Sequence, residues 1–340
     1  MDNRQIVLAQ RPVGAVNEST TTVVVSPRPE CGEGQALIKV AMLSIDPTIR
    51  TWMDDAPGYL PPIEIGDVIR GSGAGVVVES RSDYYHEGDF VFGMTGWQEW
   101  VLATDDRRFS IIPTGLGLDL ATVMNVLGVT GITAYFGVIE VGGVREGDVA
   151  VVSGAAGATG SVAGQIAKAH GARVIGIAGG AAKCAEVVER YGFDECLDYR
   201  DDHLRRRLRA ACPEGIDLYF DNVGGEILDD VLTVLALRAR VVLCGAISQY
   251  NVSGARRGIE HTSALITRRA RMEGFLVLDY EKRFAEAQGA LAAMVLSGQL
   301  HHQEHVVGGL THAPDALNLL FSGGNHGKTL VAVDESLRLG

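Results

Sequence analysis

The sequence predicts an α/β protein in which a doubly wound parallel sheet is joined to a second, β-rich domain. Three observations support this prediction. At 340 residues the chain is longer than one hydrophobic core usually organises. From about residue 127, helical and strand-like segments alternate regularly, which is typical of right-handed βαβ units. Before that point the strands are short and separated by tight glycine turns, as in a partly open antiparallel barrel.

The β-rich domain is expected at residues 1–125. Its strand-like runs are TTTVVV, ALIKV, GSGAGVVVE and GDFVFG, at 20–25, 36–40, 71–79 and 88–93. The chain returns to β character in GKTLVAV at 327–333. We therefore expect residues 300–340 to complete this first domain.

The parallel sheet is expected at residues 126–299. Its strands are predicted at 149–152, 173–177, 217–220, 240–244 and 272–278, where short apolar runs occur. Helical spacing of apolar residues occurs between or after them, at 158–170, 183–191, 225–236 and 281–297. This alternation is typical of a sheet covered by helices.

Composition limits the partners. Apolar residues make up 46% of the chain and charged residues 21%, as in ordinary soluble proteins. The net charge of −12 argues against nucleic acid or an anionic membrane, whose phosphates would be repelled. No apolar run approaches ~18 residues, and the start does not resemble a signal peptide. The five scattered cysteines are read as free thiols, so we expect a cytoplasmic protein.

The segment at 149–171 holds the chemistry of the predicted sheet. A strand is followed by a glycine turn and then by a helix that ends at Gly171. Gly157 lets the backbone approach a pyrophosphate, and Gly160 lets the helix pack on the strand, while the helix N-terminus offers free N–H groups. Ala155 replaces the first glycine of the usual GxGxxG. Strand, turn and helix together predict a Rossmann-type dinucleotide site.

The residues after the next strand predict which dinucleotide binds. NAD-binding sheets usually end this strand with an Asp or Glu that accepts hydrogen bonds from the ribose 2′-hydroxyl. Here the strand ends in Ala178-Gly179-Gly180, and Lys183 follows. An ammonium attracts a 2′-phosphate that a carboxylate would repel, so the sequence favours NADP(H). The alternative is that Lys183 is a solvated helix residue, although a lysine in a first turn opposes the helix dipole.

Longer stretches resemble one group of enzymes from end to end. They include LSIDPTIRTWM at 43–53, LGVTGITAYFG at 127–137, YFDNVGGE at 219–226, CGAISQYN at 244–251 and MEGFLV at 272–277. The chain resembles the medium-chain dehydrogenase/reductase superfamily, and within it the zinc-independent NADPH-dependent double-bond reductases, which include prostaglandin, alkenal and curcumin reductases. YFDNVGGE together with CGAISQYN is specific to this group. The resemblance implies a GroES-like β-barrel domain beside the Rossmann domain.

The resemblance also implies an activity and a set of contacts. The activity is reduction of the C=C bond of an α,β-unsaturated ketone or aldehyde, by hydride transfer to the β-carbon and protonation of the enolate. The implied cofactor contacts, position by position, are Gly157, Ala158, Thr159 and Gly160 at the pyrophosphate, Lys183 and Tyr199 at the 2′-phosphate, Asn222 at a strand end, Cys244, Gly245, Ala246, Ile247, Ser248, Tyr250, Phe275, Leu276 and Val277 along the nicotinamide half, and Asn325 from the C-terminal segment.

The enolate oxygen needs a hydrogen-bond donor, and the chain departs from the family there. Relatives have a tyrosine a few residues before the MEGF-type strand, where this chain has Thr267. Two tyrosines are candidate catalytic residues. Tyr59 lies in a stiff Pro-Gly-Tyr-Leu-Pro-Pro loop like the family's pocket-lining segment, and a ring that merely covers the barrel is an equal alternative. Tyr250 is favoured as a cofactor contact over an acid, and a ribose hydroxyl or water could instead supply the proton.

The sequence predicts no metal. Catalytic zinc needs three ligands such as Cys and His, and Ser44 with Asp46 stands in the segment where zinc relatives carry a cysteine. No C-x-x-C occurs, and the histidines at 301, 302 and 305 lack a completing Cys or acidic triad.

Two other functions stay open. An NADPH quinone oxidoreductase would share the cofactor and the fold, although the 219–226 and 244–251 stretches favour the double-bond group. A catalytically idle relative would keep NADPH binding and serve as an interaction protein, which the threonine at Thr267 favours. Because such relatives are often dimers, we expect a homodimer.

Overall fold

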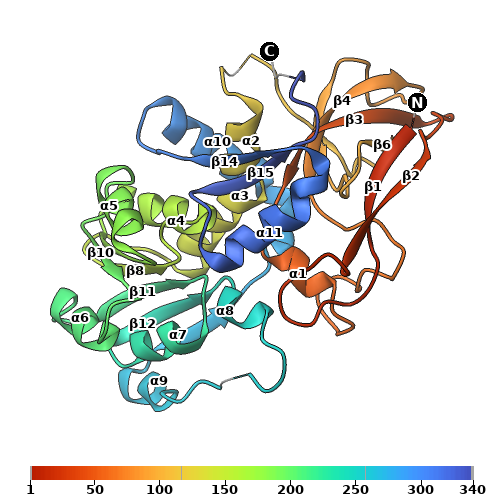
Figure 1. Cartoon of the computed structure of the whole chain (residues 1–340). Helices are drawn as coiled ribbons and strands as arrows, with labels where there is room; N and C mark the ends of the chain where they lie inside the picture. Colours follow the sequence, from red (N-terminus) through yellow and green to blue (C-terminus); the bar gives the residue numbers. More distant parts are fainter. Residues whose placement is uncertain (1, 116, 257, 338–340) are drawn as a thin grey trace. The chain divides into compact units, whose positions relative to one another are not determined.

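The computed structural model describes residues 2–115, 117–256 and 258–337, and the chain forms two compact units (Figure 1). Unit 1 is formed by the described residues up to Met124, by Glu304–Asn325 and by those from Thr329 on. Unit 2 is formed by Asn125–Gln303 and His326–Lys328. The α/β fold class is confirmed. The functional division of the chain stays a prediction. It assigns residues 1–125 and 300–340 to a substrate domain and residues 126–299 to an NADP-binding domain.

Unit 2 contains a six-stranded parallel sheet in the order β10-β9-β8-β11-β12-β13. Its strands are β8 (Val149–Ser153), β9 (Arg173–Ala178), β10 (Glu195–Asp198), β11 (Ile216–Asp221), β12 (Leu235–Leu243) and β13 (Arg271–Gly274). This is the doubly wound Rossmann order, and the direction of winding reverses between β8 and β11. The central strands are apolar and almost wholly buried, as expected where helices cover both faces.

Two helices precede the first strand of this sheet, and the others follow its strands. In chain order the helices are α3 (Val129–Phe136), η1 (Gly137–Val141), α4 (Ala158–Ala169), α5 (Ala181–Glu189), α6 (Leu204–Ala211), α7 (Gly225–Leu232), α8 (Ile247–Tyr250), α9 (Ser263–Arg268), η2 (Val277–Arg283) and α10 (Phe284–Leu296). One buried cluster joins β8, β9, β11 and β12 to α6 and α7. The core of unit 2 therefore lies between sheet and helices.

Sequence patterning misses several elements of unit 2, among them β10 and α6, and misplaces the bounds of two strands. The sequence of β10 is ECLD and that of α6 is LRRRLRAA. Both are mostly polar, so their few buried apolar residues give no clear hydrophobic pattern. The strand predicted at 240–244 begins earlier, at Leu235, and Arg238 in its middle takes a left-handed φ of 61°. The strand predicted to run to 278 ends at Gly274, and η2 starts at Val277.

Unit 1 is built on antiparallel strands. A seven-stranded sheet has the order β14-β15-β3-β4-β5-β7, with β6 paired to β3, and β1 pairs with β2 in a separate ribbon. The strands are β1 (Asp2–Leu8), β2 (Thr21–Pro27), β3 (Gln35–Ser44), β4 (Gly73–Ser80), β5 (Phe90–Gly93), β6 (Trp100–Thr104), β7 (Ser110–Ile111), β14 (Glu304–Gly308) and β15 (Lys328–Ala332). The helices are α1 (Thr48–Trp52), α2 (Leu120–Val126), η3 (Leu310–His312) and α11 (Ala313–Ser322). The last strand, β15, pairs antiparallel with β3.

The consecutive helices of Leu120–Val141 form one apolar stretch of 22 residues with a mean hydropathy of 1.6. By length and composition alone such a stretch could cross a membrane. In the structure 78% of its most apolar window is buried inside the protein, as in the core helix of a soluble protein.

Candidate functional site

The predicted cofactor residues of unit 2 gather at one edge of its sheet. The glycine turn follows β8, Lys183 lies in the first turn of the helix after β9, and Tyr199 follows β10. Asn222 follows β11, residues 244–250 follow β12, and residues 275–277 follow β13. Because all six strands are parallel, these segments share the edge at which the strands end, where open α/β sheets bind ligands.

The glycine turn is shaped for close approach of a ligand. Gly157 is the N-cap of α4 in an extended conformation, with φ −85° and ψ 169°. A Cβ at Gly160 would run into the carbonyl oxygen of Gly154, so only glycine lets the helix start there. The first N–H groups of a helix, here those of Ala158, Thr159 and Gly160, have no partner within the helix. The turn thus offers backbone donors to an anion.

The structure explains how the turn tolerates Ala155. This residue is fully buried, and its methyl group faces β9. A Cβ at Gly176 would lie 2.9 Å from the Cβ of Ala155, so the glycine on the neighbouring strand makes the room. The segment at 326–328 also lies along the turn, since the N–H of Gly327 donates to the carbonyl of Ala156 at 3.2 Å.

Two cations converge after β9 and β10. Burial lowers the pKa of Lys183, the positive charge of Arg200 lowers it further, and Glu186 opposes both. The guanidinium of Arg200 lies over the start of α5, since its Nη1 is 3.6 Å from where a Cβ at Gly180 would be. Two cations held near each other favour an anion between them. Sequence reasoning missed Arg200; its position directly after Tyr199 was the available signal.

The loop after β10 is fixed by its last residue. The carboxylate of Asp198 accepts hydrogen bonds from the N–H groups of Gly180 at 2.8 Å and Arg200 at 2.9 Å. Burial raises the pKa of this carboxyl, and the hydrogen bonds outweigh it, so the net pKa is lowered. Tyr199 is 44% exposed, and its ring covers Gly179. Asp198 therefore holds Arg200 and the start of α5 together.

Asn222 is held by the end of β8. Its side-chain Nδ2 donates to the carbonyl of Ser153 at 2.7 Å, and its backbone N–H donates to Ser153 Oγ at 2.9 Å. These bonds cross the place where the winding of the sheet reverses. Asn222 therefore lies at the crevice in which such sheets bind nucleotides.

The loop after β12 is pinned by its own side chains. The hydroxyl of Tyr250 accepts a hydrogen bond from the N–H of Ala246 at 3.0 Å, and Ser248 Oγ donates to the carbonyl of Val223 at 2.7 Å. Burial and then the charge of Asp221 raise the pKa of Cys244 to about 12, so this thiol stays protonated at neutral pH. Gly245 and Ile247 complete the loop. This geometry gives Tyr250 a role in shaping the loop.

The segment after β13 packs against η1. A Cβ at Gly137 would lie 2.7 Å from the ring of Phe275, so this glycine makes room for the ring. Leu276 is 38% exposed, and Val277 begins η2. Thr267 lies in the last turn of α9, before β13. Its side chain is exposed, and its hydroxyl donates to the carbonyl of Ala264 at 3.3 Å.

The remaining predicted residues belong to unit 1. Tyr59 is 45% exposed, its hydroxyl lies 2.8 Å from Thr48 Oγ1, and its ring meets Trp52 edge-on at 6.1 Å between centroids. Burial raises the pKa of Tyr59, opposed by its hydrogen bond with Thr48, so the hydroxyl remains a proton donor at neutral pH. Asn325 is buried and precedes the segment that joins unit 2.

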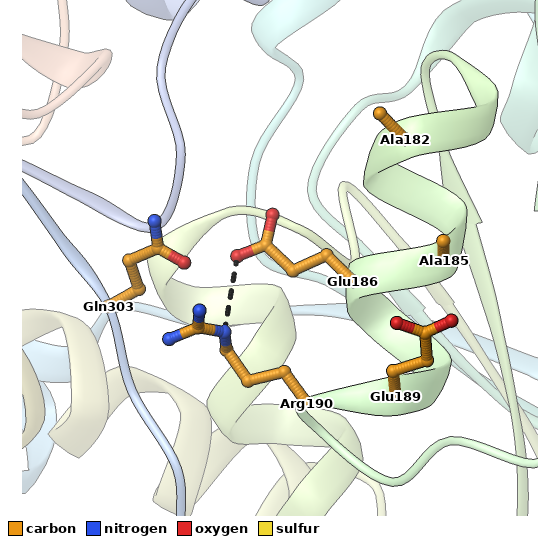
Figure 2. Close-up of a pocket in the computed structure, with 6 residues that line it drawn as sticks. All are labelled: Ala182, Ala185, Glu186, Glu189, Arg190 and Gln303. Atoms are coloured by element: carbon orange, nitrogen blue, oxygen red, sulfur yellow. Dashed lines mark ion pairs between the residues drawn. The ribbon is translucent and has the colours of Figure 1, made fainter.

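A hollow of about 400 Å³ lies between α5 and Gln303 (Figure 2). It is lined by Ala182, Ala185, Glu186, Glu189, Arg190 and Gln303. The carboxylate of Glu186 pairs with Arg190 at 3.7 Å and with His326 Nδ1 at 3.0 Å. The charge of Glu186 in this hollow is thus paired, and we assign the chemistry to the strand ends.

Comparisons with known proteins agree with this arrangement. The family model described as N-terminal domain of oxidoreductase matches residues 4–111, and the one described as zinc-binding dehydrogenase matches 158–294. The NADPH-dependent curcumin reductase of Escherichia coli is 38% identical over 97% of both chains. The 2-alkenal reductase (NADP(+)-dependent) of Nicotiana tabacum is 37% identical over 98% of both. The chain belongs to the medium-chain dehydrogenase/reductase superfamily.

A solved structure agrees with this membership. CurA from Vibrio vulnificus in complex with NADPH is 38% identical and has a TM-score of 0.93, covering 98% of this chain and 99% of CurA. The Escherichia coli and Nicotiana tabacum relatives, each matched over nearly its full length, are named as NADP(H)-dependent reductases. The predicted family and fold are therefore confirmed.

The family description names zinc, and the residues present do not fit a zinc ion. Where the structure describes the chain, it holds no group of three or more His, Cys, Asp or Glu side chains placed to bind a metal. In the segment that carries a zinc ligand in other members, Ser44 Oγ donates to the Asp46 carboxylate at 2.6 Å. We derive no step through zinc, and the absence of metal stays a prediction.

Proposed function

We propose that this protein is an NADPH-dependent reductase of the C=C bond of α,β-unsaturated ketones and aldehydes. The observation that carries the proposal is the set of anion-binding groups at one sheet edge: the turn at Gly157–Gly160 and the cations of Lys183 and Arg200. The relatives named for NADP(H) and for alkenal or curcumin reduction support the substrate class.

The residues of unit 2 would hold NADPH, which when bound supplies the hydride. The N-terminus of α4 would bind the pyrophosphate through backbone N–H groups. Lys183 and Arg200 would pair with the 2′-phosphate, with the ring of Tyr199 beside it. Asn222, the loop at 244–250 and the segment at 275–277 would line the nicotinamide half. Asn325 is kept as a further contact.

We assign to Tyr59 the role of hydrogen-bond donor to the carbonyl oxygen of the substrate. When hydride adds to the β-carbon, negative charge develops on this oxygen, and a preorganised hydroxyl donor lowers the barrier. The Thr48 hydroxyl and the Trp52 ring hold Tyr59, and the raised pKa keeps its proton in place. Thr267 satisfies its hydroxyl within α9, so it does not replace the tyrosine of relatives. Tyr250 shapes its loop and contacts the cofactor.

Steady-state oxidation of NADPH with a 2-alkenal, a long-chain enone and a quinone tests the assignment. We expect turnover of the first two and formation of the saturated carbonyl product. Turnover of the quinone alone would favour the quinone oxidoreductase. Tight NADPH binding with no turnover of any substrate would favour the catalytically idle relative.

We further propose a homodimer that forms through β13. This strand ends the sheet described for unit 2, and Leu276 and Leu278 beyond it are 38% and 47% exposed. Antiparallel pairing of two copies about Met272 would set Arg271 of one copy opposite Glu273 of the other. Light scattering should give twice the chain mass of 36.2 kDa, and Glu273→Arg should yield monomer. A wild-type monomer would overturn this proposal.

We also propose a cytoplasmic location. The five cysteines are free, and burial raises the pKa of Cys196, Cys212 and Cys244. Free thiols persist where the surroundings are reducing. Fractionation of the source cells should recover the protein with soluble cytoplasmic enzymes, and recovery outside them would contradict the proposal.

A further inference from the structure

β11 ends in a carboxylate that is wholly buried. Asp221 is 0% exposed, and its oxygens accept hydrogen bonds from Ser153 Oγ at 2.8 Å and Tyr219 Oη at 2.7 Å. The N–H groups of Val223 and Gly224 donate to it at 3.1 Å and 3.0 Å, and Gly224 also reaches the second oxygen at 3.2 Å. Burial raises the pKa of Asp221, while these donors favour its charged form.

These donors come from different elements that meet where the sheet reverses its winding. Ser153 ends β8, Tyr219 lies within β11, and Gly224 is the N-cap of α7. The backbone carbonyl of Asp221 accepts from the N–H groups of Cys244 and Gly245 after β12, at 2.9 Å and 3.0 Å. One residue thus fixes the ends of three strands and the start of a helix.

A second buried carboxylate lies at the opposite edge of the same sheet. Asp148 precedes β8, is 9% exposed, and pairs with Arg240 Nη2 at 2.5 Å. It also accepts from the N–H of Arg145 at 2.8 Å. Asp148 therefore ties the loop before β8 to β12, whereas Asp221 joins strand ends. The two carboxylates therefore lie at different edges of the sheet: Asp221 at the edge where the strands end, and Asp148 at the opposite edge.

We propose that Asp221 is a positioning residue for the cofactor: it holds Ser153, Asn222 and the turn into α7 in their binding arrangement before the nucleotide arrives. This inference rests on the proposed NADPH binding at this edge. The charge has a reason here, because an amide would present an N–H to the N–H of Gly224. Loops that already have their binding conformation lose less conformational entropy when the ligand binds.

The affinity of the full-length protein for NADPH, measured by fluorescence titration, tests the proposal. Asp221→Asn should raise the Kd about 10-fold or more, since it removes a charged acceptor from several donors. Asp148→Asn is the matched control: it should lower the Tm, yet change the Kd less than about 2-fold, because it lies at the other edge. Equal rises in Kd for both variants would overturn the proposal.

Milder variants keep the test decisive if Asp221→Asn does not fold. Ser153→Ala and Tyr219→Phe each remove one donor and should raise the Kd and the KM for NADPH about 3-fold to 10-fold, with kcat at saturating NADPH nearly unchanged. Unchanged Kd in both, or loss of kcat alone, would overturn the positioning role. A wild-type protein that binds no NADPH would instead refute the proposed function.

Discussion

The strand-end edge of unit 2 and the Tyr59 loop of unit 1 hold their functional groups in different ways. The edge offers mostly backbone N–H groups, which glycines and the carboxylates of Asp198 and Asp221 keep in place. The loop offers one half-exposed side chain, held by Thr48 and Trp52. Substitutions that distort the backbone of the strand-end edge should therefore weaken cofactor binding. Removal of the single Tyr59 hydroxyl should instead lower catalysis.

The largest effect is expected at Gly160. Gly160→Ala drives a Cβ into the backbone carbonyl of Gly154, which has no soft alternative position. NADPH binding should fall by more than about 100-fold, and folding itself should suffer. Titration with NADPH and thermal unfolding measure both.

Gly289→Ala in α10 is the control for Gly160. Its Cβ meets nothing within 4 Å, so the change should leave NADPH binding intact and raise stability by up to about 1 kcal/mol through helix propensity. Normal NADPH binding by Gly160→Ala would show that the edge is less rigid than its geometry indicates.

Tyr59→Phe should lower kcat about 100-fold, the usual cost of losing one donor to a developing oxyanion. The KM for NADPH should stay the same, because the substitution leaves the proposed NADPH-binding residues unchanged. Since burial raises the pKa of Tyr59, the wild-type kcat should not fall until the pH exceeds about 10, the ordinary tyrosine value. Unaltered kinetics would reduce Tyr59 to a ring that covers the barrel.

Lys183→Ala should raise the KM for NADPH about 10-fold to 30-fold and leave that for NADH nearly unchanged, because only NADPH carries the 2′-phosphate. Arg200→Ala should act in the same direction. Kinetics with both nucleotides measure this. If the two KM values rise together, the assignment of the 2′-phosphate to Lys183 is wrong.

Thr267→Ala should have the smallest effect, less than about 2-fold on kcat. Its hydroxyl is exposed and satisfied by the carbonyl of Ala264. Enone turnover compared with that of Tyr59→Phe sharpens the contrast between the two residues. A large loss in Thr267→Ala would return the enolate donor to α9.

Local pattern was enough to predict the fold class, the glycine turn and, to within a residue, the ends of β9, β11 and β12. The glycine turn and the YFDNVGGE motif are each a contiguous run of the sequence. Glycine is required at Gly157 and Gly160 by the local backbone. Arg200 was missed because it follows β10, whose ECLD pattern hides a strand. The contact of Gly327 with the turn, and the network at Asp221, join residues far apart in the chain, which no local pattern reveals.

Transfer of deuterium from the nicotinamide C4 of labelled NADPH to an enone tests the central claim most directly. We expect a saturated ketone that carries deuterium on its β-carbon, with the carbonyl intact, as seen by NMR and mass spectrometry. Deuterium on the carbonyl carbon of an alcohol, or no transfer from NADPH to any enone, would contradict it.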